Sequence, residues 1–187
     1  MAVEISNRQR RTRLDRIQIA ALVTAALDAE GKPADVSIAF VTSKIITDLN
    51  RRYFGRGNPT DVIAFPLHDT AGGDSAYLGE VVVCTDVAAD EARTRGIDPI
   101  DELYLYVVHG LLHLLAHTDE TPAKRTAMNR RARAIVRRFR EGQRTRGRED
   151  GRTGGREDGR TGGRRADTSK RRHKEGKKRQ RRDESTG

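Results

Sequence analysis

Two histidines stand four residues apart in the most apolar stretch of the chain. His109 and His113 lie within LYLYVVHGLLHLL, Leu103–Leu115. Residues at positions i and i+4 of a helix share one face, so the two imidazoles point the same way. Burial of two imidazoles without partners costs free energy, and a shared metal ion would satisfy one nitrogen of each. The other interpretation, two core histidines each bonded to a carbonyl group, stays open at this point.

A third metal ligand is expected just beyond these histidines. His117 continues the series, but it stands eight residues after His109, which is about 12 Å along a helix. Zinc ligand atoms lie about 2.0–2.2 Å from the ion, so His109 and His117 do not easily bind the same Zn²⁺. Asp119 falls in the turn before a second helix, where the chain can fold back. Its alternative role is to cap that helix. With His109, His113 and Asp119 as ligands, one zinc ion per chain would keep an open position for chemistry.

The pattern around this segment predicts an α+β domain. Asp98 and Pro99 are typical of the start of a helix that is apolar nearly all round and therefore buried. Thr121 and Pro122 indicate a second helix start, with its end near Arg140. We expect a small mixed four-stranded sheet packed against helices, including a zincin-like metal-binding helix. The strands are expected at Ala2–Ser6, Val36–Val41, Asp61–Phe65 and Leu78–Cys84. The other helices are expected at Leu14–Ala29, from a Ser43 cap to Tyr53, and at Asp86–Arg95. The first of these helices should have Leu14, Ile17, Ala21 and Leu27 on one face.

Charge divides the chain into two parts. The formal net charge is +10 over 187 residues, but residues 141–187 carry 17 Lys/Arg against nine Asp/Glu. This tail repeats GREDGRTG at Gly147–Gly154 and Gly155–Gly162 and has no large apolar residue. Without apolar area to offset the entropy of ordering, we expect a domain at 1–140 and a disordered basic tail at 141–187. The tail has two interpretations, an arm that holds phosphate groups and a low-complexity extension that adds solubility.

Composition excludes several classes of protein. The lone Cys84 excludes an internal disulfide framework and a multi-cysteine zinc ribbon, and fits a reducing compartment. The longest near-continuous apolar run has 13 residues interrupted by two His and a Gly, whereas a bilayer span needs about 20. The first residues lack the apolar segment of a secretory signal. A cytoplasmic protein without membrane contact is the expectation. Gly110 stands where zinc peptidases of the His-Glu-x-x-His type have their Glu, which argues against that class.

Several motifs resemble one known family. HGLLHLLAHTD (His109–Asp119) is similar to the His-Gly-x-x-His metal motif of the YbeY family of rRNA maturation endoribonucleases, with its third ligand six residues later. LNRRYFGRGNPTDVIAFP (Leu49–Pro66) and LGEVVVCTDVAADEA (Leu78–Ala92) also match in order and spacing. The resemblance covers residues 3–140. It implies a zinc-dependent endoribonuclease for single-stranded RNA, active in small-subunit (16S) rRNA maturation and ribosome quality control, with rRNA and the small ribosomal subunit as partners.

The chain departs from the pattern of this family at four positions. Asp119 stands where the third ligand is commonly His, Ala116 where the helix exit has Gly, and Phe54 where Arg follows the motif Tyr. Arg56 could supply the missing charge from the same loop. Glu80 replaces Asp and keeps the charge.

Substrate contacts and the general base stay open in the sequence. An arginine stripe on the last helix could contact phosphate groups or could simply be a solvated face; its members are Arg130, Arg133, Arg137 and Arg140, opposite Met128, Ala132, Ile135 and Phe139. With 4% aromatic residues, we expect recognition of the backbone or shape of RNA more than base stacking. Asp61 and Glu80 are candidates for proton transfer, and neither is assigned. The alternatives are a non-enzymatic RNA-binding protein with a structural metal and another metal-dependent hydrolase on this scaffold.

Overall fold

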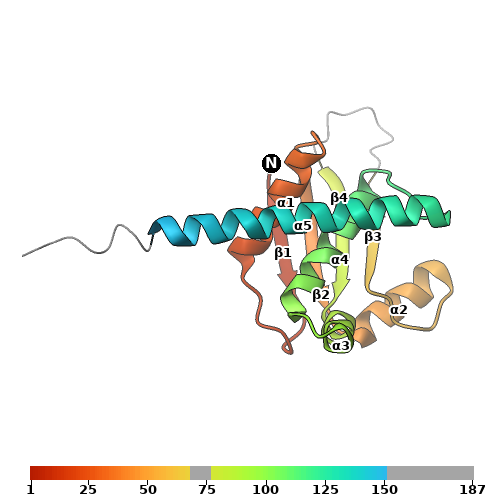
Figure 1. Cartoon of the computed structure of the whole chain (residues 1–187). Coiled ribbons are helices and arrows are strands. Elements are labelled where there is room, and N and C mark those ends of the chain that lie inside the picture. Colours follow the sequence, from red (N-terminus) through yellow and green to blue (C-terminus); the bar gives the residue numbers. More distant parts are fainter. Residues whose placement is uncertain (68–76, 151–187) are drawn as a thin grey trace, which may run out of the picture. The chain divides into compact units, whose positions relative to one another are not determined.

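The structure, a computed structural model, describes residues 1–67 and 77–150 (Figure 1). The predicted α+β class is confirmed in this part of the chain. Its strands are β1 (Val3–Asn7), β2 (Asp35–Val41), β3 (Val62–Pro66) and β4 (Tyr77–Cys84). Its helices are α1 (Arg16–Ala29), α2 (Ser43–Phe54), α3 (Thr85–Arg95), α4 (Pro99–Leu114) and α5 (Pro122–Asp150). None of these helices is both long and apolar enough to cross a bilayer.

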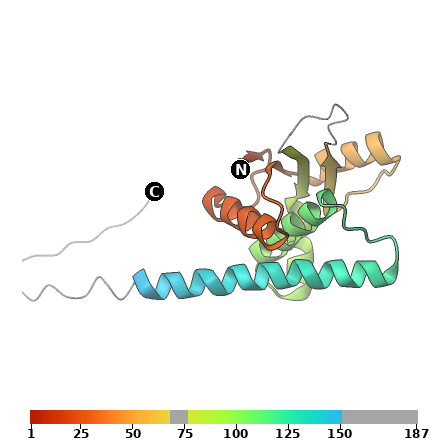
Figure 2. The same cartoon turned by 90° about the horizontal axis from the view of Figure 1, so that it is seen from above.

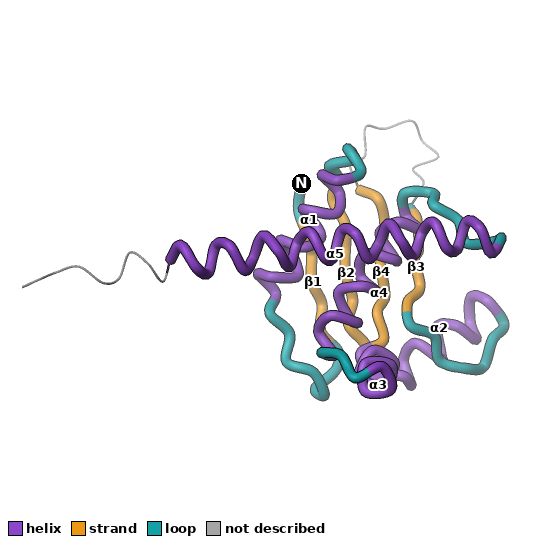
Figure 3. Tube along the Cα trace, in the orientation of Figure 1, coloured by secondary structure: helices purple, strands orange, loops and turns teal. Residues whose placement is uncertain are grey.

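The four strands form one mixed sheet in the order β1-β2-β4-β3 (Figure 3). Strands β1, β2 and β4 run parallel, with Ile5 beside Ile38 and Ile38 beside Val81. Strand β3 pairs antiparallel with β4 and stands at the edge of the sheet. Because side chains alternate along a strand, Ile38 and Phe40 face one side of β2, and Ala39 and Val41 face the other. The small mixed sheet is therefore confirmed.

Helices cover both faces of this sheet. On one face α1 and α4 enclose the main core, which includes Leu22, Phe40 and Leu111. Helix α5 packs on α4 and α1 and is the outermost layer on that side (Figure 2). Helix α2 covers the other face through a smaller core around Ile46 and Val82. This layering holds α4 between the sheet and α5.

Helix α4 starts as its sequence predicts and lies unusually close to the sheet. The Asp98 side chain accepts a hydrogen bond from the Ile100 amide at 2.8 Å, and Pro99 occupies the first turn. A Cβ added at Gly110 would come within 2.3 Å of a Val81 methyl group and 2.9 Å of a Val62 methyl group. Glycine is thus required at position 110 for the approach of α4 to β3 and β4.

A left-handed residue ends α4. Ala116 has φ = 64°, and it is the one non-glycine residue with positive φ in the described part of the chain. The Ala116 amide donates to the His113 carbonyl group at 3.0 Å, and the His117 amide donates to that of Leu112 at 2.9 Å. This pair of bonds is a Schellman motif, which normally has glycine at the left-handed position. Ala116, which stands where the motif pattern has Gly, therefore adopts a conformation that normally favours glycine.

Two local expectations for the first helices are wrong. Ile17 is 81% exposed, because the buried stripe of α1 is instead Ile19, Leu22, Val23, Ala26 and Leu27. The spacing of Ile17 from Ala21 suits a helix face, but it is the solvent-side face. Ser43 does not cap α2: it is the first residue of that helix, and its amide donates to the Asp86 carboxylate at 2.7 Å. The cap thus comes from a neighbouring helix.

Helix α5 is longer than expected. It begins at Pro122, and the Thr121 hydroxyl accepts from the Lys124 amide at 3.2 Å, as the sequence indicates. It then continues to Asp150 instead of ending near Arg140. Arginine and glutamate, which favour helix, outweigh the two glycines between Arg140 and Asp150. The tail from residue 151 and the loop at 68–76 lie outside the described residues, so tail disorder and the domain boundary at 140 stay predictions.

Candidate metal centre and its two pockets

His109, His113 and Asp119 come together in the structure. One ligand atom from each lies within 4.8 Å of the others, and each of the three side chains is half-buried. The rings of His109 and His113 stand 4.9 Å apart between centroids, at 74° to each other. Two imidazoles and a carboxylate are an established donor set for catalytic zinc. The group is therefore a possible metal site.

The end of α4 explains how Asp119 reaches the histidines. His109 and His113 share one face of the helix because they are one turn apart. The left-handed Ala116 then ends the helix and turns the chain, and the segment that follows brings Asp119 near the two histidines. Asp119 lies in this segment, as the forced turn between the helices predicts.

His117 takes another role. Its Nε2 lies 3.1 Å from a carboxylate oxygen of Glu30, at the C-terminal end of α1. The Arg131 side chain donates to the other oxygen of Glu30 at 2.6 Å. His117 therefore belongs to a brace between α1, the turn after α4, and α5, and it is not part of the candidate metal group.

Burial keeps His109 in the form that can bind a metal. Desolvation is the largest influence and lowers its pKa, and the nearby His113 lowers it further. The negative charges of Asp61 and Asp119 oppose this shift without reversing it. Because the pKa lies below 6.5, the imidazole is mostly neutral at pH 7, and a neutral ring nitrogen is the metal ligand.

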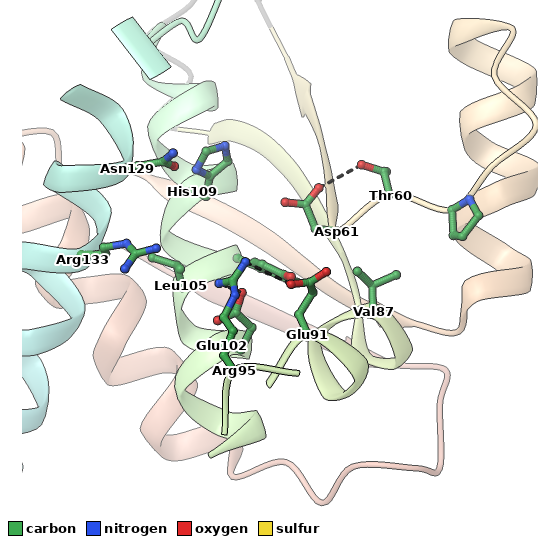
Figure 4. Close-up of a pocket in the computed structure, with 12 residues that line it drawn as sticks. Thr60, Asp61, Val87, Glu91, Arg95, Glu102, Leu105, His109, Asn129 and Arg133 are labelled. Atoms are coloured by element: carbon green, nitrogen blue, oxygen red, sulfur yellow. Dashed lines mark hydrogen bonds and ion pairs between the residues drawn. The ribbon is translucent and has the colours of Figure 1, made fainter. Parts of the chain in front are cut away.

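A cavity of about 410 Å³ opens beside His109 (Figure 4). Asp61, which follows Thr60 at the start of β3, faces it from the wall opposite His109. The Thr60 hydroxyl donates to the Asp61 carboxylate at 2.9 Å. Asn129 and Arg133 of α5 line the same cavity. Carboxylate, amide and guanidinium groups thus surround the approach to His109, and we name this cavity the His109 pocket.

A buried acid network forms part of the wall of the His109 pocket. Glu102 is 1% exposed and accepts a hydrogen bond from Arg95 at 2.8 Å. Arg95 also pairs with Glu91 at 3.1 Å. Burial raises the pKa of Tyr106, and the charge of Glu102 raises it further, so this phenol stays protonated. No local sequence signal singles out Glu102, because a carboxylate in the first turn of a helix is ordinarily a dipole partner in solvent.

A second cavity, of about 480 Å³, also adjoins the group. His113 and Asp119 line it together with Phe54 and Arg56, and we name it the Phe54 pocket. Thr60 borders both pockets. Each of the three candidate ligands therefore lines one of two neighbouring cavities.

Comparison with known proteins identifies the family. The family described as endoribonuclease YbeY matches residues 4–140. An endoribonuclease YbeY from Salinispora tropica is 36% identical over 68% of this chain and 89% of its own length. One from Beutenbergia cavernae is 35% identical over 76% of this chain and its full length. The chain belongs to the endoribonuclease YbeY family. The family resemblance found in the sequence is confirmed, and so, at the level of the family, is the enzyme class.

A solved structure shares the fold of this chain. The solution structure of TM1509 from Thermotoga maritima matches with a TM-score of 0.55 and 26% identity. It covers 82% of this chain and 99% of the other. The likeness therefore extends over the sheet and helices that position the candidate metal group.

The remaining candidate residues separate into those near the pockets and those away from them. Asp61 lines the His109 pocket, whereas Glu80 is exposed on β4 and lines neither pocket. Arg133 faces the His109 pocket, as the stripe on α5 suggests. Arg140 is occupied: it pairs with Asp101 at 2.6 Å and lies 4.8 Å from the Tyr104 ring centre. The stripe is thus partly structural.

Proposed function

We propose that this YbeY-family protein is a metal-dependent endoribonuclease that cleaves single-stranded RNA. The observation that carries the proposal is the meeting of His109, His113 and Asp119, each of which lines one of two pockets. We propose these three residues as ligands of one zinc ion. The three ligand atoms lie within 4.8 Å of one another. Small side-chain rotations would shorten these distances to about 3.4 Å, the spacing expected around tetrahedral zinc. The residues present therefore fit the ion.

The side chains around the group would divide the work of catalysis. A bound zinc ion supplies a Lewis acid and lowers the pKa of bound water to about 7. Arg133 in the His109 pocket and Arg56 in the Phe54 pocket form no ion pair with the described side chains, those of residues 1–67 and 77–145. Within that part of the chain both guanidinium groups are available to hold phosphate oxygens, one in each pocket.

Asp61 is the carboxylate that we propose as proton acceptor. It faces His109 across the pocket. Two hydrogen bonds fix its position: the Thr60 hydroxyl donates to its carboxylate, and the Cys84 amide donates to its backbone carbonyl group. A general base must lie within reach of the reacting water, directly or through one water molecule. Glu80 does not meet this requirement, because it lines neither pocket.

The biological substrate that we propose is small-subunit rRNA, cleaved during maturation and ribosome quality control. Support comes from the family match over residues 4–140 and from the strongly basic chain. A net charge of +10 favours polyanionic partners such as rRNA within the small ribosomal subunit.

Metal content and cleavage together test the proposal. Purified protein should contain about one zinc per chain and cleave single-stranded RNA oligonucleotides but not peptides. His113→Ala and Asp119→Ala should lose both metal and cleavage. Glu120→Ala is the matched control, because Glu120 is an adjacent exposed acid outside the group.

Other outcomes separate the alternatives. Peptide hydrolysis without RNA cleavage would favour a different hydrolase on this scaffold. Metal that is retained without any hydrolysis would favour a structural ion, which normally has four protein ligands. Full metal content in Asp119→Ala would show that the third ligand is a different residue.

A further inference from the structure

Aromatic side chains gather at the C-terminal end of α2. The Tyr53 ring meets the Phe65 ring edge-to-face, with 4.9 Å between centroids. The Phe54 ring stacks over Phe65 at 6.4 Å and 28°. Tyr53 is 55% exposed and Phe54 is 53% exposed, and no other Phe or Tyr in the described residues is exposed. The chain thus places two of its eight Phe and Tyr side chains at one solvent-facing spot.

The local backbone explains why Phe54 stays uncovered. It is the last residue of α2, and Gly55 follows in the left-handed conformation with φ = 70°. The chain turns away at once, so no further helical turn shields the ring. Strand β3 stands at the edge of the sheet (Figure 3), and its Phe65 ring supports the Phe54 ring from one side. Exposure of a large apolar ring costs free energy, and an uncovered ring beside a cavity indicates a binding surface.

The exposed ring belongs to the cavity that contains two of the candidate metal ligands. Phe54 lines the Phe54 pocket together with His113 and Asp119. Its volume of about 480 Å³ lies within the usual range of 300–1,000 Å³ for small-ligand sites. A planar group stacked on Phe54 would therefore lie in the same cavity as the candidate reaction centre.

The charges around the ring suit a nucleic acid. Arg56 lines the same pocket and makes no ion pair in the part of the chain that the structure describes. The Arg52 guanidinium lies 5.6 Å from the centre of the Tyr53 ring. An aromatic platform beside a free guanidinium is the combination with which proteins bind single-stranded nucleic acid, since each base offers a face and each phosphate a charge.

We propose that the Phe54 ring is a stacking platform for one unpaired nucleobase of the RNA substrate. The inference rests on the proposed function and adds a base-binding subsite to it, with Arg56 on an adjacent phosphate. In a duplex the bases stack on one another and are not free for a protein ring, so the subsite selects single strands. Because every base has such a face, it does not select sequence.

The test uses full-length protein and a short single-stranded RNA with one 2-aminopurine, a base whose fluorescence falls when it stacks. Titration of the RNA with wild-type protein should quench this fluorescence. Phe54→Leu keeps apolar volume without an aromatic face, so it should lose the quenching and raise the dissociation constant and KM about tenfold, with kcat little changed. Phe54→Tyr should behave as wild type. Ile17→Ala, at an exposed residue of α1, is the matched control.

The outcomes distinguish this subsite from the nuclease itself. Equal quenching and equal KM in wild type and Phe54→Leu would overturn the platform even if the protein cleaves RNA. Quenching that depends on Phe54 in a protein without nuclease activity would support the platform and contradict the proposed function. A duplex RNA that binds both proteins equally would support selection of single strands, and a duplex that requires Phe54 would overturn it.

Discussion

At the scale of single residues, Ala116 stores strain next to the candidate metal centre. A left-handed conformation costs an L-residue with a Cβ about 1–2 kcal/mol, and glycine avoids that cost. The residue cannot relax, because its amide and that of His117 close the end of α4. The strained turn delivers Asp119 to the histidines, so the protein uses this strain to shape the site.

Ala116→Gly should therefore stabilise the protein. Relief of strain exceeds the entropy that glycine adds to the unfolded chain, and the net gain should be about 0.5–1 kcal/mol. Denaturant unfolding measures it. Ala127→Gly, at an exposed helical position of α5, is the control and should destabilise by a similar amount. Destabilisation by both glycines would contradict the strained exit.

Asp61 is the residue whose replacement tests proton transfer. Asp61→Asn keeps shape and loses the basic carboxylate, so cleavage of RNA should fall by about 10²–10⁴ while zinc content stays at the wild-type level. Glu80→Gln, on the exposed side of β4, should change neither the cleavage rate nor the zinc content. A wild-type cleavage rate in Asp61→Asn would exclude this role.

At the scale of elements, the contact of α4 with the sheet sets the positions of both histidines. Gly110 lies between His109 and His113 along the helix and packs against Val81 and Val62. A methyl group there would meet atoms that belong to two strands of the sheet, and neither strand can move without the other. Packing and the metal group are thus coupled in one helix.

Gly110→Ala should destabilise the protein and weaken metal binding. Overpacking of a close contact costs about 1–3 kcal/mol. Displacement of α4 should also raise the dissociation constant for zinc, measured by competition with a chelator. Gly142→Ala in α5 is the matched control, because an added Cβ there meets nothing within 4 Å. That change should be neutral or stabilising. Wild-type stability in Gly110→Ala would show that the helix can move freely.

Glu30 joins three elements around the turn that carries Asp119. Burial alone would raise its pKa, but the hydrogen bond and charge of Arg131, followed by those of His117, lower it below 4.5. A carboxylate with a lowered pKa in the folded state stabilises the fold above its unfolded pKa. That stabilisation is lost as the pH falls through the folded pKa.

Glu30→Gln should therefore destabilise the protein at pH 7 by about 1 kcal/mol, since Arg131 is half-exposed. The difference from wild type should shrink as the pH falls below 4.5, because the wild-type carboxyl group is then protonated as well. Thermal unfolding between about pH 7 and pH 3 measures this. A difference that stays constant over that range would contradict the ionic brace.

The success of sequence-based prediction varies with the kind of signal. Asp98, Pro99 and Thr121 are local signals, and the starts of α4 and α5 follow them. The spacing of His109 and His113 and the forced turn after them predicted that Asp119 would lie near the two imidazoles, and it does. The prediction that Ile17 is buried was wrong, because two faces of α1 carry apolar residues and only tertiary packing decides which face is buried.

Contacts between residues on different elements could not be predicted from the sequence. Phe54 and Phe65 lie on different elements, and no local pattern indicates that their rings stack. The 4% aromatic content led to the expectation of little base stacking, yet composition does not show where the aromatic residues gather. Arg140 belonged to a stripe with two interpretations, phosphate contact or a solvated face, and the structure pairs it with Asp101 instead.

At the scale of the whole molecule, positive charge is concentrated in the C-terminal part of the sequence. Residues 1–140 are nearly neutral, with 20 Lys/Arg and 18 Asp/Glu. Residues 153–187 lie outside the described part of the chain. These residues carry 13 Lys/Arg against six Asp/Glu. The division predicts that catalysis and general affinity for RNA reside in different parts of the chain.

Deletion of residues 170–187 should weaken RNA binding and leave the folded unit intact. This segment holds nine Lys/Arg and three Asp/Glu. The matched control is deletion of residues 153–169, which hold four Lys/Arg and three Asp/Glu. Fewer ionic bonds to phosphate make binding less dependent on salt, so the decrease in affinity should be large at about 50 mM salt and small at about 500 mM. The thermal midpoint should not change in either deletion.

Fluorescence anisotropy with labelled single-stranded RNA over a salt series measures both effects. The slope of log affinity against log salt should become shallower when residues 170–187 are removed and should hardly change when residues 153–169 are removed. Two equal slopes would assign the tail to solubility alone. A lower thermal midpoint after removal of residues 170–187 would instead show that the tail packs on the folded unit, because chain without contacts to that unit contributes nothing to its stability.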